Sequence, residues 1–260
     1  MNAFSLEHKV ALVTGGGRGI GATIARVFAE AGAAVAVVAR TADEVETVAD
    51  DIRSTGGRAT AVTADLSDPS QLPGVIERIV AELGGLDVLV NNAGGGTSPR
   101  FVDTRIEHLE AAFHMNVAVP FELARLALPH LLERSGASII NMSSVGARKA
   151  ARGNLAYHVA KSALAHMTRL MAADLGPRVR VNALLPGPVR TAALEGVLEA
   201  RPELRDLLIE RTRMRRIGTP EDVAYAAAYL ASPAASWVTG VLFDVNGGEV
   251  DELMAVAPDL

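Results

Sequence analysis

The sequence contains no cysteine. This absence excludes disulfide bonds, thiol nucleophiles and thiolate metal sites, and it leaves the cellular compartment open. Aromatic residues are scarce, at 4% of the 260 residues, with three tyrosines and one tryptophan, and lysine occurs only three times. The six histidines show no metal-ligand spacing, so we expect no metal site.

Long apolar runs and an excess of basic charge are missing too. No uninterrupted apolar segment is long enough to span a bilayer, and Met1–Lys9 is too short and mixed for a signal peptide. The formal net charge of −5 gives no reason to expect nucleic acid or an anionic membrane as a partner. Charged residues make up 21% and hydrophobic residues 49%, an ordinary globular composition. We therefore expect a cytoplasmic protein.

Short apolar runs alternate with longer segments of helical periodicity along the whole chain. Apolar residues recur three and four positions apart in Ile20–Ala31, Thr41–Thr55 and Pro69–Leu83, which predicts helices. The runs that predict buried strands are Lys9–Thr14, Ala34–Ala39, Arg58–Thr63, Leu86–Asn91, Ser138–Met142, Arg178–Ala183 and Val241–Val245. This alternation predicts an α/β fold of Rossmann type, with about seven parallel strands, doubly wound and covered by helices on both faces.

We find no linker or internal repeat that would divide the chain, so we expect one domain over residues 1–260. Residues 191–216 follow a predicted strand and are too many for an ordinary loop, which is typical of a substrate lid. Residues 251–260 are expected to form a C-terminal tail.

A glycine-rich turn follows the first predicted strand and leads into a helix. It reads Thr14-Gly15-Gly16-Gly17-Arg18-Gly19-Ile20-Gly21. Glycines let backbone N–H groups approach a pyrophosphate at a helix N-terminus. A flexible turn without a ligand is the alternative, but the position between strand and helix favours a dinucleotide site. The candidate ligands here are Gly15, Arg18, Gly19, Ile20 and Gly21.

Tyr157 and Lys161 are four positions apart on a predicted helix, which places their side chains on one face. An ammonium nearby favours the phenolate, so we expect a tyrosine pKa below its reference of about 10. Such a tyrosine can exchange a proton with an alcohol or carbonyl near neutral pH. Chance pairing is improbable because both residue types are so rare in this chain.

The spacing Thr-Gly-x-x-x-Gly-x-Gly, with this tyrosine and lysine, resembles the short-chain dehydrogenase/reductase family from about Lys9 to Gly248. Ser144, thirteen residues before Tyr157, matches the family's substrate-orienting serine, with Ser143 as the rival. Asn116 matches the asparagine that holds a water linking Lys161 to solvent in the family. The resemblance therefore implies a catalytic tetrad of Asn116, Ser144, Tyr157 and Lys161, in which Lys161 also binds the nicotinamide ribose and Tyr157 lies beside it.

The same resemblance assigns further cofactor contacts. They are Asp65 and Leu66 at the adenine, Asn92, Ala93 and Gly94 after the fourth strand, and Pro186, Gly187, Val189 and Thr191 after the sixth strand.

The end of the second strand bears on the choice between NADP(H) and NAD(H). An acid at this position selects NAD by binding the ribose 2′-hydroxyl, and this chain has Ala39 there. Arg40, followed by Thr41, can pair with a 2′-phosphate, and Arg18 can reach the same group. Solvated surface charges are the alternative for both arginines. The sequence favours NADP(H), with NAD(H) still possible.

The substrate is less well defined. Three short stretches, Asn91–Gly96, Ser232–Gly240 and Gly247–Leu253, resemble bacterial 7α-hydroxysteroid dehydrogenases, and the last two imply a homotetramer. The implied reaction interconverts a secondary alcohol and a ketone, with a hydroxysteroid, a 3-oxoacyl thioester or a small ketone as substrate. Arg148, Lys149 and Arg152 could bind an anionic tail, although a solvated loop face is the stronger interpretation. The alternative function is a non-catalytic NADP(H)-binding sensor or scaffold.

Overall fold

Seven parallel strands form one sheet in the computed structural model, which describes residues 2–96 and 99–248. The strands are β1 (Val10–Thr14), β2 (Ala34–Ala39), β3 (Arg58–Thr63), β4 (Val88–Asn91), β5 (Ala137–Met142), β6 (Val179–Pro186) and β7 (Leu242–Val245). Their spatial order is β3-β2-β1-β4-β5-β6-β7, so the direction of winding changes between β1 and β4. The predicted doubly wound α/β fold is confirmed.

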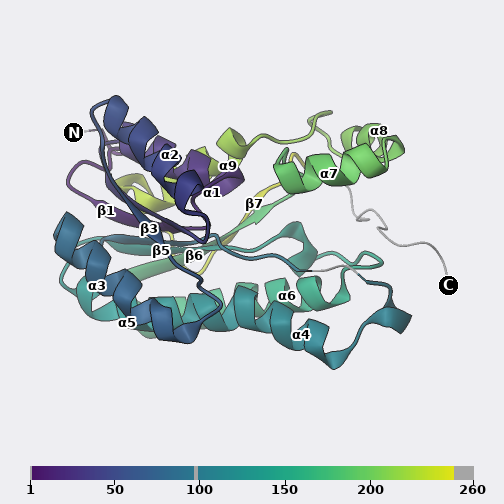
Figure 1. The fold of residues 1–260 in the computed structure, drawn as a ribbon, viewed down its shortest axis with the longest axis horizontal. Helices are drawn as coiled ribbons and strands as arrows, with labels where there is room; N and C mark the ends of the chain where they lie inside the picture. Colours follow the sequence, from purple (N-terminus) through teal and green to yellow (C-terminus); the bar gives the residue numbers. More distant parts are fainter. Residues whose placement is uncertain (1, 97–98, 249–260) are drawn as a thin grey trace.

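Helices cover both faces of this sheet (Figure 1). One layer consists of α1 (Gly19–Glu30), α2 (Ala42–Ser54) and α9 (Pro220–Ala231), and the other of α3 (Leu72–Leu83), α4 (Ile106–Phe113), α5 (Val119–Leu132) and α6 (Leu155–Leu175). Strands β1, β2, β4, β5 and β6 are buried on both sides, because successive side chains point to opposite faces and helices cover both, whereas β7 is partly exposed. In β1, Ala11 and Val13 belong to the first core, with Phe28 of α1, while Leu12 packs in the second, with Leu123 of α5.

Two differences from the expected strands concern the site. β4 begins at Val88 rather than Leu86, and the Asp87 carboxylate just before it accepts a hydrogen bond from the N–H of Val10 at 3.0 Å. β6 continues three residues past Ala183, so Pro186 ends the strand instead of following it. Proline lacks an N–H, which is tolerated at the end of a strand.

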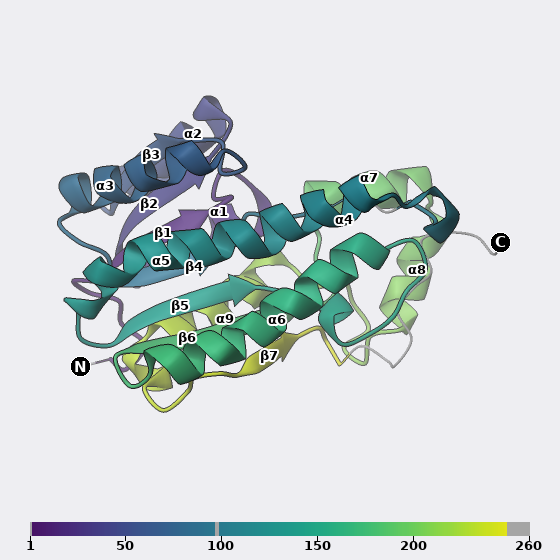
Figure 2. The same cartoon turned by 90° about the horizontal axis from the view of Figure 1, so that it is seen from below.

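The segment 191–216 contains two short helices, α7 (Ala192–Ala200) and α8 (Glu203–Glu210). Their apolar residues Leu198, Leu204 and Leu208 form a small core of their own. Figure 2 shows these helices beyond the carboxyl ends of the strands, and in Figure 1 they lie on the opposite side of the sheet from α4 and α6. The position fits the expected lid, whose function stays a prediction. The expected tail, residues 251–260, lies outside the described residues.

None of the helices that the structure describes is both long enough and apolar enough to cross a bilayer.

Candidate active site

A cleft of about 910 Å³ opens where the sheet changes direction, at the carboxyl ends of the strands. Ligand sites in open α/β sheets lie at this switch point. Thirteen of the residues predicted to bind a cofactor line it, namely Gly15, Arg18, Gly19, Ile20, Gly21, Arg40, Thr41, Asp65, Leu66, Asn92, Ala93, Gly94 and Thr191. The structure therefore collects residues from β1, α1, β2, β3, β4 and α7 around one space.

The glycine-rich turn has no room for side chains. Gly15 and Gly19 adopt left-handed φ angles of 62° and 56°, which favour glycine. A Cβ on Gly21 would lie 2.2 Å from the carbonyl oxygen of Gly15. Across the cleft, the side chain of Thr191 lies 3.6 Å from the position of a Cβ on Gly19. The turn thus presents bare backbone at the N-terminus of α1, an arrangement that fits a pyrophosphate.

The hydroxyl of Thr14 joins the ends of β1 and β4. Its oxygen accepts hydrogen bonds from the N–H groups of Asn92 and Ala93, at 2.9 and 3.0 Å, and it donates to the carbonyl of Val90. The amide of Asn92 donates back to the carbonyls of Thr14 and Gly15. These bonds hold the glycine turn against the segment after β4.

Charged residues gather at the end of the cleft next to β2. Arg40 is exposed there, and its charge contributes to lowering the pKa of Asp65, after the two hydrogen bonds from Ser67 that lower it most. Glu44, from the first turn of α2, also lines this end and forms a 3.7 Å ion pair with Arg18. Glu44 was not among the predicted site residues, because the family pattern has its acid at the end of β2 and Glu44 lies in α2.

The predicted catalytic residues meet where α6 begins. Tyr157, two residues into α6, forms a side-chain hydrogen bond with Ser144. Ser144 caps a short helical turn, its hydroxyl accepting from the N–H of Gly146 at 3.1 Å. The alternative residue, Ser143, is buried, and its hydroxyl donates to the backbone carbonyl of Lys161 instead of bonding to Tyr157. Tyr157 also lies beside Gly96, which lines the cleft.

Lys161 is almost fully buried beneath Tyr157. Its ammonium nitrogen lies 5.6 Å from the centre of the Tyr157 ring and donates a 2.7 Å hydrogen bond to the carbonyl of Met142. Burial lowers the pKa of Lys161 to about 7. The side chain is therefore only partly charged near neutral pH.

Asn116 lies in a π-helical turn, His114–Ala118, between α4 and α5. Such turns are rare in proteins, and those that occur are often found at functional sites. Pro120 lacks the N–H that would bond to the carbonyl of Asn116 in a regular α-helix, which explains why the helix widens here. The Asn116 amide donates to the carbonyls of Gly95 and Ala112, at 2.7 and 2.8 Å. The sequence predicted the residue but not the π turn.

Gly94 separates Asn116 from Lys161. A Cβ at this position would lie 2.6 Å from the Asn116 side-chain oxygen and 3.2 Å from the Lys161 nitrogen. Only a residue without a side chain lets the loop after β4 pass between them. Asn116 and Lys161 thus lie against Gly94, and Tyr157 lies against Gly96, at the edge of the cleft, although none of the four predicted catalytic residues lines it.

The expected effect of Lys161 on the tyrosine is wrong in direction. Burial raises the pKa of Tyr157 above its usual value, and the hydrogen bond from Ser144 only partly opposes this. The reason is that both groups are withdrawn from water, and the lysine itself loses charge. At neutral pH, Tyr157 is therefore a protonated phenol.

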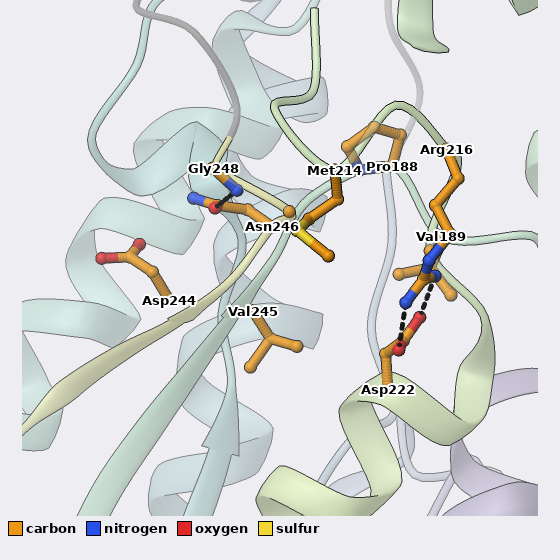
Figure 3. A pocket seen from close by; sticks show the side chains of 11 residues that line it. Pro188, Val189, Met214, Arg216, Asp222, Asp244, Val245, Asn246 and Gly248 are labelled. Atoms are coloured by element: carbon orange, nitrogen blue, oxygen red, sulfur yellow. Dashed lines mark hydrogen bonds and ion pairs between the residues drawn. The ribbon is translucent and has the colours of Figure 1, made fainter.

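Pro186, Gly187 and Val189 do not line the main cleft, although Thr191 does. Val189 instead borders a second pocket of about 290 Å³ behind this segment, at the end of β7 (Figure 3). Figure 3 shows Arg216 paired with Asp222 on one side of that pocket, at 2.6 and 2.7 Å. Asp244, which also lines the pocket, pairs with Arg148 outside it.

The basic residues before α6 bear on the substrate. Arg148 pairs with Asp244 of β7 and donates to the carbonyl of Leu242 at 2.9 Å. Arg215 likewise donates to the carbonyl of Glu210. Arg148 is therefore committed to the fold rather than to an anionic substrate. Among residues 2–96 and 99–248, no three His, Asp or Glu side chains gather as they would around a metal ion.

This geometry agrees with what is known of similar proteins. Residues 15–249 match the family model described as enoyl-(acyl carrier protein) reductase. An uncharacterized oxidoreductase of Mycobacterium tuberculosis is 49% identical over 95% of this chain and 94% of its own. A 7α-hydroxysteroid dehydrogenase of Escherichia coli is 39% identical over 95% of this chain and 96% of its own.

Solved structures agree as well. A 7α-hydroxysteroid dehydrogenase complexed with NADH and 7-oxoglycochenodeoxycholic acid is 39% identical and superimposes with a TM-score of 0.92, covering 96% of this chain and 98% of the other. A putative NAD(P)-dependent gluconate 5-dehydrogenase of Beutenbergia cavernae, with NADP bound at low occupancy, is 37% identical with a TM-score of 0.90, covering 95% and 98%.

The chain belongs to the short-chain dehydrogenase/reductase family, whose members use NAD(P)(H). It is an oxidoreductase that acts on CH–OH groups.

Removing the buried charge of Lys161 should stabilise the protein at low pH. An unfolded lysine keeps its proton up to about pH 10.4, whereas folded Lys161 releases it at about pH 7. The unfavourable contribution is thus complete below pH 7 and disappears as the pH rises toward 10. We expect Lys161→Met to raise the free energy of unfolding at pH 6 by on the order of 5 kcal/mol, since the two pKa values differ by more than three and each unit corresponds to about 1.4 kcal/mol.

Chemical denaturation of both proteins at pH 6, 7.5 and 9 measures this difference. The gain should shrink as the pH rises. A constant difference across the three pH values would contradict it.

Proposed function

We propose that the protein is an NADP(H)-dependent oxidoreductase that interconverts a secondary alcohol and a ketone, with Tyr157 as the general acid and base. The observation that carries this proposal is the hydrogen bond between Tyr157 and Ser144 beside the nitrogen of Lys161. A phenol, a hydroxyl and an ammonium then surround the space in which the substrate oxygen would lie.

The chemistry follows from the protonation of these groups. Tyr157 is protonated near neutral pH, so it can donate its proton to the oxygen of a ketone during reduction. Ser144, held by the N–H of Gly146, orients that oxygen and stabilises charge developing on it. In the reverse direction Tyr157 accepts the proton of the alcohol, which requires the phenolate that its surroundings disfavour.

Lys161 and Asn116 support the tyrosine from below. Lys161 has a pKa of about 7, so it gains and loses a proton in the working range of pH. Its nitrogen lies between the tyrosine ring and Gly94, and the Asn116 side chain lies at Gly94 as well. We infer that these two residues return a proton to Tyr157 after each turnover, as the family pattern implies.

The cleft fits a nicotinamide dinucleotide, because the glycine turn exposes backbone at the N-terminus of α1 and residues that follow β2, β3 and β4 line the rest of the space. Gly15, Gly19 and Ile20 would hold the pyrophosphate, Asp65 and Leu66 the adenine, and Asn92 with Lys161 the nicotinamide side. When bound, the cofactor supplies or accepts the hydride. Pro186, Gly187 and Val189 are proposed as contacts at the nicotinamide end on the family pattern alone.

The preference for NADP(H) rests on two arginines. Arg40 and Arg18 line the end of the cleft at β2, and guanidinium groups match the geometry of phosphate oxygens. The similar structures include one with NADH and one with NADP, so the family accommodates both.

The substrate class is a hydroxysteroid, a 3-oxoacyl thioester or a small ketone. A hydroxysteroid is supported by the 39% identity to the 7α-hydroxysteroid dehydrogenase of Escherichia coli and by the similar structure that contains a 7-oxo bile acid. We propose that α7 and α8 form the lid over this substrate, because Thr191–Ala193 line the cleft at the start of α7. The hypothesis of a non-catalytic sensor or scaffold gains no support from these relatives.

Two exposed apolar faces indicate self-association. Trp237 is 98% exposed, and Phe4, Tyr229 and Phe243 form a chain of ring contacts beside the free edge of β7. On another face, α4, α5 and α6 expose Phe113, Phe121, Val159 and Leu170. Exposed patches of this kind mark protein interfaces. Two different faces on one chain are what a homotetramer of dihedral symmetry requires, and we propose that assembly, in the cytoplasm.

Tyr157→Phe tests the proposed mechanism. The variant keeps the ring and loses the proton, so turnover should fall at least about 100-fold while NADPH binding is retained. Ketone reduction is followed by NADPH absorbance over a panel of steroids, acyl thioesters and small carbonyls, and binding by NADPH fluorescence.

Tyr225→Phe is the matched control, since Tyr225 is exposed on α9 and does not line the cleft. Unchanged turnover in Tyr157→Phe would refute the mechanism. Binding of NADPH by the wild type without turnover across the whole panel would favour the sensor hypothesis.

Arg40→Ala tests the 2′-phosphate site. The loss of a charged hydrogen bond should weaken NADPH binding by about tenfold or more and leave NADH binding nearly unchanged. Arg58→Ala removes an exposed arginine outside the cleft and serves as the control. Equal effects on the two cofactors would show that Arg40 does not bind the 2′-phosphate.

Trp237→Glu tests the assembly. A charge at the centre of an apolar face should split the tetramer into dimers, which sedimentation velocity detects. Trp237 is the only tryptophan, so its emission in the wild type also reports burial. Tryptophan emission typical of a fully exposed indole at micromolar concentration would count against this interface.

A further inference from the structure

Glu44 places a carboxylate near the position at which dinucleotide-binding folds usually have an acidic residue. In those folds an acid at the end of the second strand binds the ribose 2′-hydroxyl, and here that position is Ala39. A Cβ on Gly17 would lie 3.5 Å from the Cβ of Ala39, and also 3.1 Å from a carboxylate oxygen of Glu44. The carboxylate from α2 and the end of β2 therefore border the same point above the glycine turn.

The Glu44 carboxylate is also coupled to the positive charge nearby. Its other oxygen lies 3.7 Å from a guanidinium nitrogen of Arg18. This distance allows an attraction between charges but not a short hydrogen bond. The side chain of Glu44 is 35% exposed and that of Arg18 is 75% exposed, so both remain accessible to a ligand in the cleft.

The two charges have opposite effects on the two cofactors. Arg18 and Arg40 attract a 2′-phosphate, whereas a carboxylate between the glycine turn and β2 repels it. A carboxylate can accept a hydrogen bond from a ribose 2′-hydroxyl, which only NAD(H) offers at this position. The described cleft thus contains the charge features of both cofactor types.

We propose that Glu44 is a specificity-determining residue that lets this enzyme use NAD(H) as well as NADP(H). Its carboxylate accepts a hydrogen bond from the ribose 2′-hydroxyl of NAD(H). It also repels the 2′-phosphate of NADP(H) and so weakens the attraction that Arg18 and Arg40 exert on that phosphate. This inference rests on the proposed function, in which a nicotinamide dinucleotide occupies the cleft.

A purely structural role for Glu44 is the competing explanation. An acid in the first turn of α2 stabilises the helix through its dipole, and Glu44 is placed there together with Asp43. That role would change the stability of the protein without changing its choice between the cofactors. The ratio of the two dissociation constants separates the explanations.

The experiment compares Glu44→Gln with the wild type, using the full chain. NADPH and NADH are titrated separately by fluorescence, and thermal unfolding is recorded for each protein. We expect NADPH to bind about fivefold more tightly to the variant, because removing one charge in a solvent-exposed site has an effect of this order. NADH should bind more weakly, so the ratio of dissociation constants shifts by about tenfold or more.

Glu46→Gln is the matched control. Glu46 lies on the same helix, is exposed, and pairs with Arg53 away from the cleft. It should leave the ratio unchanged. Glu44→Ala, which also removes the charge, should give the same gain for NADPH if electrostatic repulsion is its cause.

The outcomes are distinct. An unchanged ratio in both Glu44 variants, with or without a lower melting temperature, overturns the inference and leaves the proposed function intact. A wild type that binds neither NADPH nor NADH overturns the proposed function itself. A shift toward NADPH in both Glu44 variants and not in Glu46→Gln supports the inference.

Discussion

The hydroxyl of Thr14 joins two strands that are neighbours in the sheet and far apart in the sequence. It is buried at the point where the winding of the sheet reverses, and it bonds to three backbone groups at the end of β4. The glycine turn and the loop at Gly94 are thereby held on either side of one cleft. The positions of the cofactor and of the catalytic residues depend on this junction, since Gly94 in turn touches both Asn116 and Lys161.

Burial acts in opposite senses on the two titratable residues of the proposed tetrad. Withdrawal from water raises the pKa of Tyr157 and lowers that of Lys161 to about 7. The acid therefore keeps its proton, while the lysine beside it exchanges one in the physiological range. A buried amine disfavours folding, so the site is maintained at the expense of stability. The compensation comes from the two apolar cores that enclose the sheet.

Much of the architecture was predictable because it depends on local pattern. Apolar runs and helical periodicity located the strands to within a few residues, and the alternation of elements determined the doubly wound sheet. The spacing of Tyr157 and Lys161 on one helix face, and the glycines after β1, pointed to the family. One departure arose from distant partners, because pairing with β5 and β7 lengthened β6.

The sequence by itself determined the class of fold and the family, because these follow from residue types at fixed spacings, and the tetrad it predicts remains a proposal. Only the tertiary structure decided how charges separated along the chain act on each other. It raised the pKa of Tyr157 where the nearby lysine alone would lower it, paired Arg148 with Asp244, and brought Glu44 to the end of β2. These interactions depend on solvent exposure and on contacts between distant segments, and the spacing of residues along the sequence reveals neither.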